Sequence, residues 1–178
     1  MIFGFMGAPT LAWIGRRIGK RPTMFLALGI ALAAFGGNWF WFNPQYPWLQ
    51  LIGSGAGAFA SAGFAMIGGS ILADIMDYDE LDTGKRREGA FSACSSWINK
   101  AGSASGYFIA GQILNLIGFN SALGSAQSQH TLLLLRSTLV AGPVIGISLG
   151  MLFLLGFTLT QEKMRSIRLE LERRRGKF

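Results

Sequence analysis

The chain has 178 residues, of which 51% are hydrophobic and only 14% are charged, and its mean hydropathy is +0.39. This composition is far more apolar than that of a soluble domain of similar size, and it predicts an integral membrane protein. The net charge of +7 comes from 16 lysines and arginines against nine acids. In a soluble protein this excess would raise the question of nucleic acid, but the placement of the charges between apolar runs indicates the lipid bilayer as the partner and no nucleic acid.

Four apolar runs are each long enough to cross a membrane, since a helix needs about 20 residues to span a hydrocarbon core of roughly 30 Å. A fifth run, at the start of the chain, reaches only about 21 Å at 1.5 Å per residue, and we expect it to be the second half of a longer helix. In chain order the predicted spans are residues 1–14, 22–42, 48–73, 90–119 and 133–160. We therefore expect an all-α integral membrane fold of about five transmembrane helices over residues 1–160, the first truncated, followed by a basic tail at 161–178.

The basic residues alternate from one connection to the next. The turn at residues 16–21 contains four, the following connection none, the charged stretch at 74–88 three, the next connection none, and the tail seven. All nine acids lie on the same side as these basic residues, so no predicted span contains an acid. By the positive-inside rule this pattern predicts a multi-pass protein of the cell inner (plasma) membrane with its C-terminus in the cytoplasm.

Lys100 is the one charge well inside a predicted span. It lies about ten residues, or roughly 15 Å, into that span, close to the middle of the bilayer. An ammonium group there is costly unless it meets a carboxylate, a water-filled cavity or a substrate, which makes it a functional candidate. The alternative is that the preceding residues lie along the interface and that Lys100 only snorkels towards water.

The residues three, four and seven positions from Lys100 share its helix face. They are Ser96, Trp97, Ser103 and Tyr107. Hydroxyls, aromatic rings and an ammonium group on one stripe suit a polar, ring-shaped ligand, because hydrogen bonds can hold its hydroxyls while an aromatic face covers its C–H side. For either aromatic residue alone, simple packing against a neighbouring helix is the preferred interpretation.

Two stretches closely resemble a known family of carriers. A-D-I-M-D-Y-D-E-L-D-T-G-K-R-R-E-G-A-F at residues 73–91, followed by a helix carrying N-K-A-G-S-A, resembles the loop before the eleventh helix, and that helix, of the glycoside/pentoside/hexuronide:cation symporters. These are sugar carriers of the major facilitator superfamily. P-T-L-A-W-I-G-R-R-I-G-K-R at residues 9–21 resembles the basic turn between their eighth and ninth helices. The resemblance covers essentially the whole chain and implies most of the C-terminal half of a facilitator fold.

The resemblance implies secondary active transport by alternating access, with a sugar or glycoside carried together with sodium or a proton. In such carriers two six-helix halves enclose a site near the bilayer midplane. The coupling cation would be bound mainly by carboxylates of the missing N-terminal half, which would also face Lys100. A carrier of a non-sugar solute such as a lysolipid is the nearest alternative. A small membrane subunit whose partner chain supplies acidic membrane residues is the alternative from a different class.

The charged stretch carries a second candidate site. Asp74 and Asp77 lie three residues apart at the end of a span, and Arg86, Arg87 and Glu88 open the next helix at the same level. The resemblance implies that the matching acids and arginine belong to a cytoplasmic gate of salt bridges that breaks when the carrier opens inwards. Exposed pairs are worth only about 0 to 1 kcal/mol each, which suits a gate because neither state is trapped. The alternative is an ordinary solvated loop.

No pattern predicts catalysis, a cofactor or a metal site. The spans lack the grouping of acid, His or Cys that hydrolysis or metal binding requires, so an enzyme is not expected. A calcium loop beginning at Asp77 fails because its sixth position, which needs Gly, is Asp82. The tail places Met164, Ile167 and Leu171 on one side. This spacing predicts either an amphipathic helix on the anionic inner leaflet or, alternatively, a solvated disordered tail.

Overall fold

In a computed structural model the structure describes residues 2–43, 45–157, 160–174 and 176, and these are mostly helical, with short connections and no strand. Met1 and residues 158–159 of the predicted spans, and residues 175 and 177–178 of the predicted tail, lie outside the described residues. The helices are α1 (Ile2–Ile18), α2 (Lys20–Gly36), α3 (Asn38–Trp41), α4 (Leu49–Thr83), α5 (Glu88–Leu116), the 3-10 helix η1 (Ser121–Ala126), α6 (Gln129–Leu155) and α7 (Gln161–Arg174).

Three segments of the described chain are long and apolar enough to cross a membrane: α2 together with α3, α4, and α6. These correspond to three of the five predicted spans, and the all-α membrane fold is confirmed. α1 has only 17 residues, and α5, although it has 29, is rich in serine and glycine and carries Lys100. Membrane crossing by α1 and α5 therefore stays a prediction.

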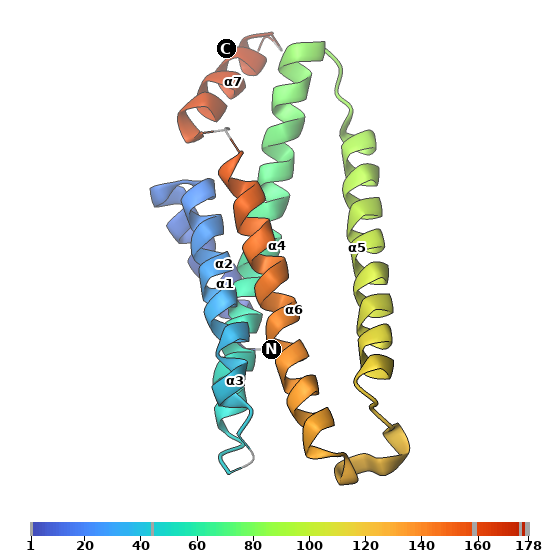
Figure 1. The fold of residues 1–178 in the computed structure, drawn as a ribbon. Coiled ribbons are helices and arrows are strands. Elements are labelled where there is room, and N and C mark those ends of the chain that lie inside the picture. The colour runs from blue at the N-terminus through green and yellow to red at the C-terminus, as the bar shows by residue number, and fades with distance from the viewer. Residues whose placement is uncertain (1, 44, 158–159, 175, 177–178) are drawn as a thin grey trace.

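The core of the bundle forms where α1 and α2 pack along α4 and where α6 packs against α2 (Figure 1). Leu11, Met24, Ala27 and Ile67 make one buried apolar cluster at this junction. The backbones of α1 and α4 come close at Gly7 of α1, where an added Cβ would lie 2.2 Å from a backbone oxygen of α4. Small residues that allow this kind of backbone contact are typical of helix pairs in membranes, where lipid gives no hydrophobic force between helices.

A single residue, Gly19, connects α1 to α2. Its backbone has φ 94° and ψ 159°, a conformation that is essentially restricted to glycine. The basic turn predicted at residues 16–21 is therefore much tighter than a loop, because α1 ends at Ile18 and α2 begins at Lys20. As a result, the four basic side chains of the turn are gathered at one end of the bundle.

α4 is longer than the sequence analysis predicted. The predicted span ends at residue 73 and the acidic stretch after it was expected to be a loop, but the helix continues to Thr83. At 1.5 Å per residue its 35 residues extend about 52 Å, well beyond a hydrocarbon core of roughly 30 Å. The extension persists because Leu81 packs against α7 and because Gly84, in a left-handed conformation, ends the helix. Only residues 84–87 connect α4 to α5.

The tail forms the helix α7, and α7 lies on the extension of α4 (Figure 1). Met164, Ile167 and Leu171 are each about 95% buried and pack around Leu81. The apolar face that was expected on the inner leaflet is therefore occupied by α4. The amphipathic helix predicted for the tail is therefore present, but its apolar face packs on α4 and not on lipid, and the disordered alternative is wrong for the described part of the tail.

α5 stands apart from the other helices in Figure 1. None of its described residues is buried, and Trp97, Tyr107, Phe108 and Leu116 are each more than 65% exposed. A helix of this length that keeps large apolar side chains exposed offers them to lipid or to another membrane helix.

Candidate functional site

The predicted substrate stripe lies on the exposed surface of α5. Ser96, Trp97, Lys100, Ser103 and Tyr107 are all exposed, with Trp97 at 71% and Tyr107 at 81% of their full surface. They lie within 12 consecutive residues of one continuous helix, so the shared face expected from their spacing is present. No other described helix packs over this face.

Lys100 lies near the middle of α5, about 18 Å from the first residue of the helix. Within the described parts of the chain its ammonium group has no hydrogen bond and no ion pair. This agrees with the absence of acids from the predicted spans. Any counter-charge for Lys100 must therefore come from outside the described residues.

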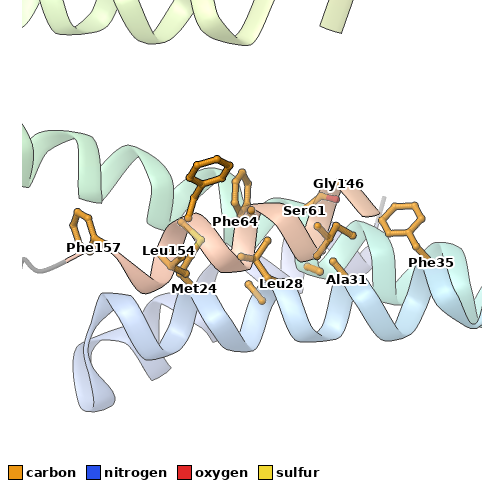
Figure 2. Close-up of a pocket in the computed structure, with 14 residues that line it drawn as sticks. Met24, Leu28, Ala31, Phe35, Ser61, Phe64, Gly146, Leu154 and Phe157 are labelled. Atoms are coloured by element: carbon orange, nitrogen blue, oxygen red, sulfur yellow. The ribbon is translucent and has the colours of Figure 1, made fainter. Parts of the chain in front are cut away.

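A cavity of about 520 Å³ lies among α2, α4 and α6, as Figure 2 shows. Its walls are apolar, with side chains such as Met24, Leu28, Phe35 and Phe64. Its hydroxyl group, that of Ser61, already donates a 2.8 Å hydrogen bond to the carbonyl oxygen of Gly57. A sugar needs several free hydrogen-bonding groups, so this cavity does not suit one. It contains no residue of the α5 stripe.

A buried ion-pair network in the described structure is centred on Asp74. The residue is only 3% exposed, and its two carboxylate oxygens accept hydrogen bonds of 2.6 Å each from Lys20 Nζ and Arg168 Nη2. Lys20 also donates to the carbonyl oxygen of Ser70 at 3.1 Å. We call Lys20, Asp74 and Arg168 the Asp74 triad; it joins the α1–α2 turn, α4 and the tail helix.

Two members of the Asp74 triad were missed by the sequence analysis. Lys20 was counted among the basic residues of the turn, and Arg168 among those of the tail, but neither was assigned to the gate. The pairs are separated by 54 and 94 positions in the chain, respectively. One indication of these pairs was present in the sequence: the basic residues of the turn and of the tail lie on the same predicted side of the membrane as the acids.

The other predicted gate residues do not pair with one another as a single gate: Asp77 is near the tail helix, and the two arginines form local pairs. Asp77 lies 3.5 Å from Arg168 and makes no hydrogen bond or ion pair with Arg86 in the described structure. Arg86 instead pairs with Glu88 at 2.5 Å. Arg87 binds Asp79 with two hydrogen bonds, one from Nε at 2.9 Å and one from Nη2.

These local pairs alter the protonation equilibria of the two arginines. The hydrogen bond that Arg86 donates to Glu88 raises the pKa of the Arg86 guanidinium above its ordinary value, and the hydrogen bonds that Arg87 donates to Asp79 do the same for the pKa of Arg87. Both guanidinium groups therefore stay charged at every physiological pH. Any opening of these pairs must come from a conformational change and not from deprotonation of the arginines.

Within the described residues, no group of three or more His, Cys, Asp or Glu side chains is positioned to hold a metal ion. The single cysteine, Cys94, is a free and exposed thiol on α5. What the site offers chemically is therefore charge and hydrogen bonding: one unpaired ammonium group on α5 and a network of ion pairs at one end of the bundle.

Comparison with known proteins places the chain among transporters. Residues 1–161 match the family described as MFS/sugar transport protein, where MFS is the major facilitator superfamily. The chain is 31% identical to an isoprimeverose transporter of Lactiplantibacillus pentosus over 147 residues. These residues cover 80% of this chain and 29% of that protein. It is 29% identical over 159 residues to an uncharacterized symporter of Synechocystis, covering 87% of this chain and 29% of the relative.

A third relative is an uncharacterized symporter of Bacillus subtilis, 26% identical over 156 residues, which is 86% of this chain and 32% of the relative. The chain thus spans less than a third of the length of these relatives. No solved structure matches it significantly. The resemblance to sugar symporters drawn from the sequence is confirmed at the level of the family, as is the expectation of a transporter family and not an enzyme. The chain is an integral membrane protein, and it belongs to the MFS/sugar transport family.

Proposed function

We propose that this chain is part of a secondary active transporter that carries a sugar or glycoside together with sodium or a proton by alternating access. Family membership and the names of two symporters and one isoprimeverose transporter among the relatives support the proposal. The single observation that carries it is Lys100, an unpaired and exposed ammonium group in the middle of α5, which is predicted to cross the membrane.

The energetic argument concerns the environment of Lys100. A lysine at the centre of a membrane helix costs about 2.5 to 3.5 kcal/mol on insertion scales. We propose that carboxylates on membrane helices outside this chain offset that cost, and that these carboxylates also bind most of the coupling cation. The proposed partner is the N-terminal half of a longer carrier or a second membrane chain. Exposure of the whole α5 face is consistent with a partner helix packing there.

We propose that the α5 stripe contributes to the sugar site. The Ser96 and Ser103 hydroxyls and the Lys100 ammonium group would bind sugar hydroxyls, while Trp97 or Tyr107 would cover the C–H side of the ring. Aromatic residues that are 71% and 81% exposed are available for such stacking without displacement of another helix of this chain.

We propose that the ion pairs at the other candidate site stabilise the state that is closed to the cytoplasm. Asp74 and Asp77 would contribute through Lys20 and Arg168, while Arg86, Arg87 and Glu88 stiffen the short α4–α5 connection. This assignment places the gate on the side where the α1–α2 turn, the end of α4 and α7 meet (Figure 1). The same side carries nearly all the basic residues, which supports a cytoplasmic orientation of this end and of the C-terminus.

The test is uptake of labelled isoprimeverose and related glycosides by membranes that contain this chain within its complete carrier. Lys100→Ala should abolish accumulation against a gradient while membrane insertion, measured by immunoblot, is unchanged. Lys85→Ala is the matched control, because Lys85 is an exposed lysine of the α4–α5 connection and lies in neither the stripe nor the Asp74 triad. Normal accumulation by the Lys100→Ala variant would refute the role proposed for this lysine.

A further inference from the structure

A second cavity, of about 720 Å³, lies between the α1–α2 turn and α7. Asp74 and Phe157 also contribute to its lining. The cavity is distinct from the α5 stripe and from the apolar cavity of Figure 2, with which it shares only Phe157. We call it the turn–tail cavity.

The lining of the turn–tail cavity is strongly basic. It contains five basic side chains and two acidic ones: Arg16, Lys20, Arg21, Arg165 and Arg168 against Asp74 and Glu172. Asp74 is already bound by two of the cations at 2.6 Å each, so it has no spare capacity to neutralise the other three. Arg21 donates a 2.8 Å hydrogen bond to the carbonyl oxygen of Leu155, which leaves its positive charge without an anion in the described structure.

Arg16 and Arg165 carry the argument furthest. Both line the cavity, Arg16 from the end of α1 and Arg165 from α7, and neither makes an ion pair with any described residue. Cations that line one cavity are normally paired with nearby carboxylates, but no described carboxylate forms an ion pair with Arg16 or Arg165. Their guanidinium groups can each donate two parallel hydrogen bonds to a phosphate group.

The position of the cavity also points to a ligand with a polar head and an apolar portion. Ile18, Phe157 and Leu169 give its lining an apolar side, and the apolar helix α6 ends at Leu155, beside Arg21. The basic side chains therefore lie at the level where membrane spans end. Basic pockets at this depth on the cytoplasmic side are suited to anionic lipid head groups.

We propose that the turn–tail cavity is a binding site for a phosphate-bearing anion, held by Arg16 and Arg165 from opposite elements. A phosphate placed there reduces the excess positive charge of the cavity and links α7 to the α1–α2 turn. The phosphate belongs either to an anionic phospholipid of the inner leaflet or to a soluble phosphate, and both present the same anionic oxygens. This inference does not depend on the transported substrate, because no residue of the α5 stripe takes part.

The test compares lipid retention by the full chain purified from membranes of equimolar phosphatidylglycerol and phosphatidylcholine, read by native mass spectrometry. The wild-type chain should retain phosphatidylglycerol in preference to phosphatidylcholine. The variant with Arg16→Gln and Arg165→Gln should retain roughly 30-fold less phosphatidylglycerol, as expected for the loss of two basic contacts near an anionic surface.

The matched control is the variant with Lys85→Gln and Arg173→Gln. It removes the same number of positive charges from exposed positions that make no ion pair in the described structure and lie outside the lining of the cavity. Circular dichroism of both variants establishes that the helices are retained. Retention of phosphatidylglycerol by the control together with its loss from the cavity variant supports the site.

A second arm uses inorganic phosphate alone, measured by isothermal titration calorimetry in neutral detergent. Phosphate binding that the cavity variant loses, without selective lipid retention, supports the same site with a soluble ligand. Equal behaviour of the cavity and control variants in both arms overturns the proposal, because the basic residues would then act only as diffuse surface charge. The conservative variant with Arg16→Lys and Arg165→Lys should keep most of the binding, which separates loss of charge from local misfolding.

Discussion

We predict that the Asp74 triad contributes to the docking of the tail helix α7 on α4. Asp74→Asn keeps the size of the side chain and one acceptor oxygen, but it replaces the other oxygen with an NH₂ group that faces a cation and cannot accept a hydrogen bond. One of the two 2.6 Å contacts is therefore lost together with the charge. A hydrogen bond to a charged group contributes about 1.5 to 3 kcal/mol.

For Asp74→Asn we expect a loss in the lower part of this range of about 1.5 to 3 kcal/mol. The Arg168 side chain is 52% exposed and the Lys20 side chain 32% exposed, so both cations can recover hydration when the carboxylate is removed. We expect docking of α7 to weaken by about 1.5 to 2 kcal/mol, which raises the undocked population roughly 10- to 30-fold. The apolar contact of Met164, Ile167 and Leu171 with Leu81 remains, so docking is weakened and not abolished.

The assay is the rate of trypsin cleavage within α7, followed by mass spectrometry of the tail peptides from the purified full chain. When opening is faster than cleavage, this rate is proportional to the undocked population. Glu88→Gln is the control, because it removes an acid from the exposed pair with Arg86, which has no contact with α7. An unchanged cleavage rate in the Asp74→Asn protein, or an equal increase in the Glu88→Gln protein, would refute the reasoning.

Two further predictions concern packing and the gate. Gly7→Ala places a methyl group 2.2 Å from a backbone oxygen of α4, so the free energy of unfolding, measured by titration with denaturing detergent, should fall by about 1 to 2 kcal/mol after the gain in helix propensity is included. Gly29→Ala, which has open space around its added Cβ, is the control and should be neutral or stabilising. Equal effects of the two substitutions would contradict the packing of α1 on α4. A double-mutant cycle of Asp77→Asn with Arg168→Gln should show coupling of up to about 1 kcal/mol in the trypsin assay. The cycle of Asp77→Asn with Arg86→Gln should show none, because Arg86 is bound to Glu88, and the reverse ranking would restore a direct Asp77–Arg86 pair.

Several features of the site followed from the sequence because they depend only on local spacing and burial in lipid. The lack of acids in the apolar runs made Lys100 conspicuous, and helical periodicity placed Ser96, Trp97 and Tyr107 on its face; both features are present in α5. Sugar binding by that face stays a prediction, because no other described helix packs against it to complete a binding site.

The end of α4 was predicted less well. A transition from apolar to acidic residues after Ala73 resembles the end of a span, but it marks only the point where the helix leaves the apolar region. An α-helix satisfies its own backbone hydrogen bonds equally well in water, so polarity alone does not end it. The helix ends at Gly84, where a left-handed backbone conformation becomes necessary.

The amino-acid sequence by itself determined that this chain lies in a membrane, which of its segments are apolar helices, and that the basic residues gather on one side. Composition and periodicity are sufficient for these features, because the cost of placing charge or unpaired backbone groups in lipid applies to each segment separately. Only the tertiary structure decided that Asp74 is bound by Lys20 and Arg168 and that α7 covers α4. Those contacts join residues 54 and 94 positions apart. Several bases were available to each acid, and the packing of the helices selects which of them come within hydrogen-bonding distance.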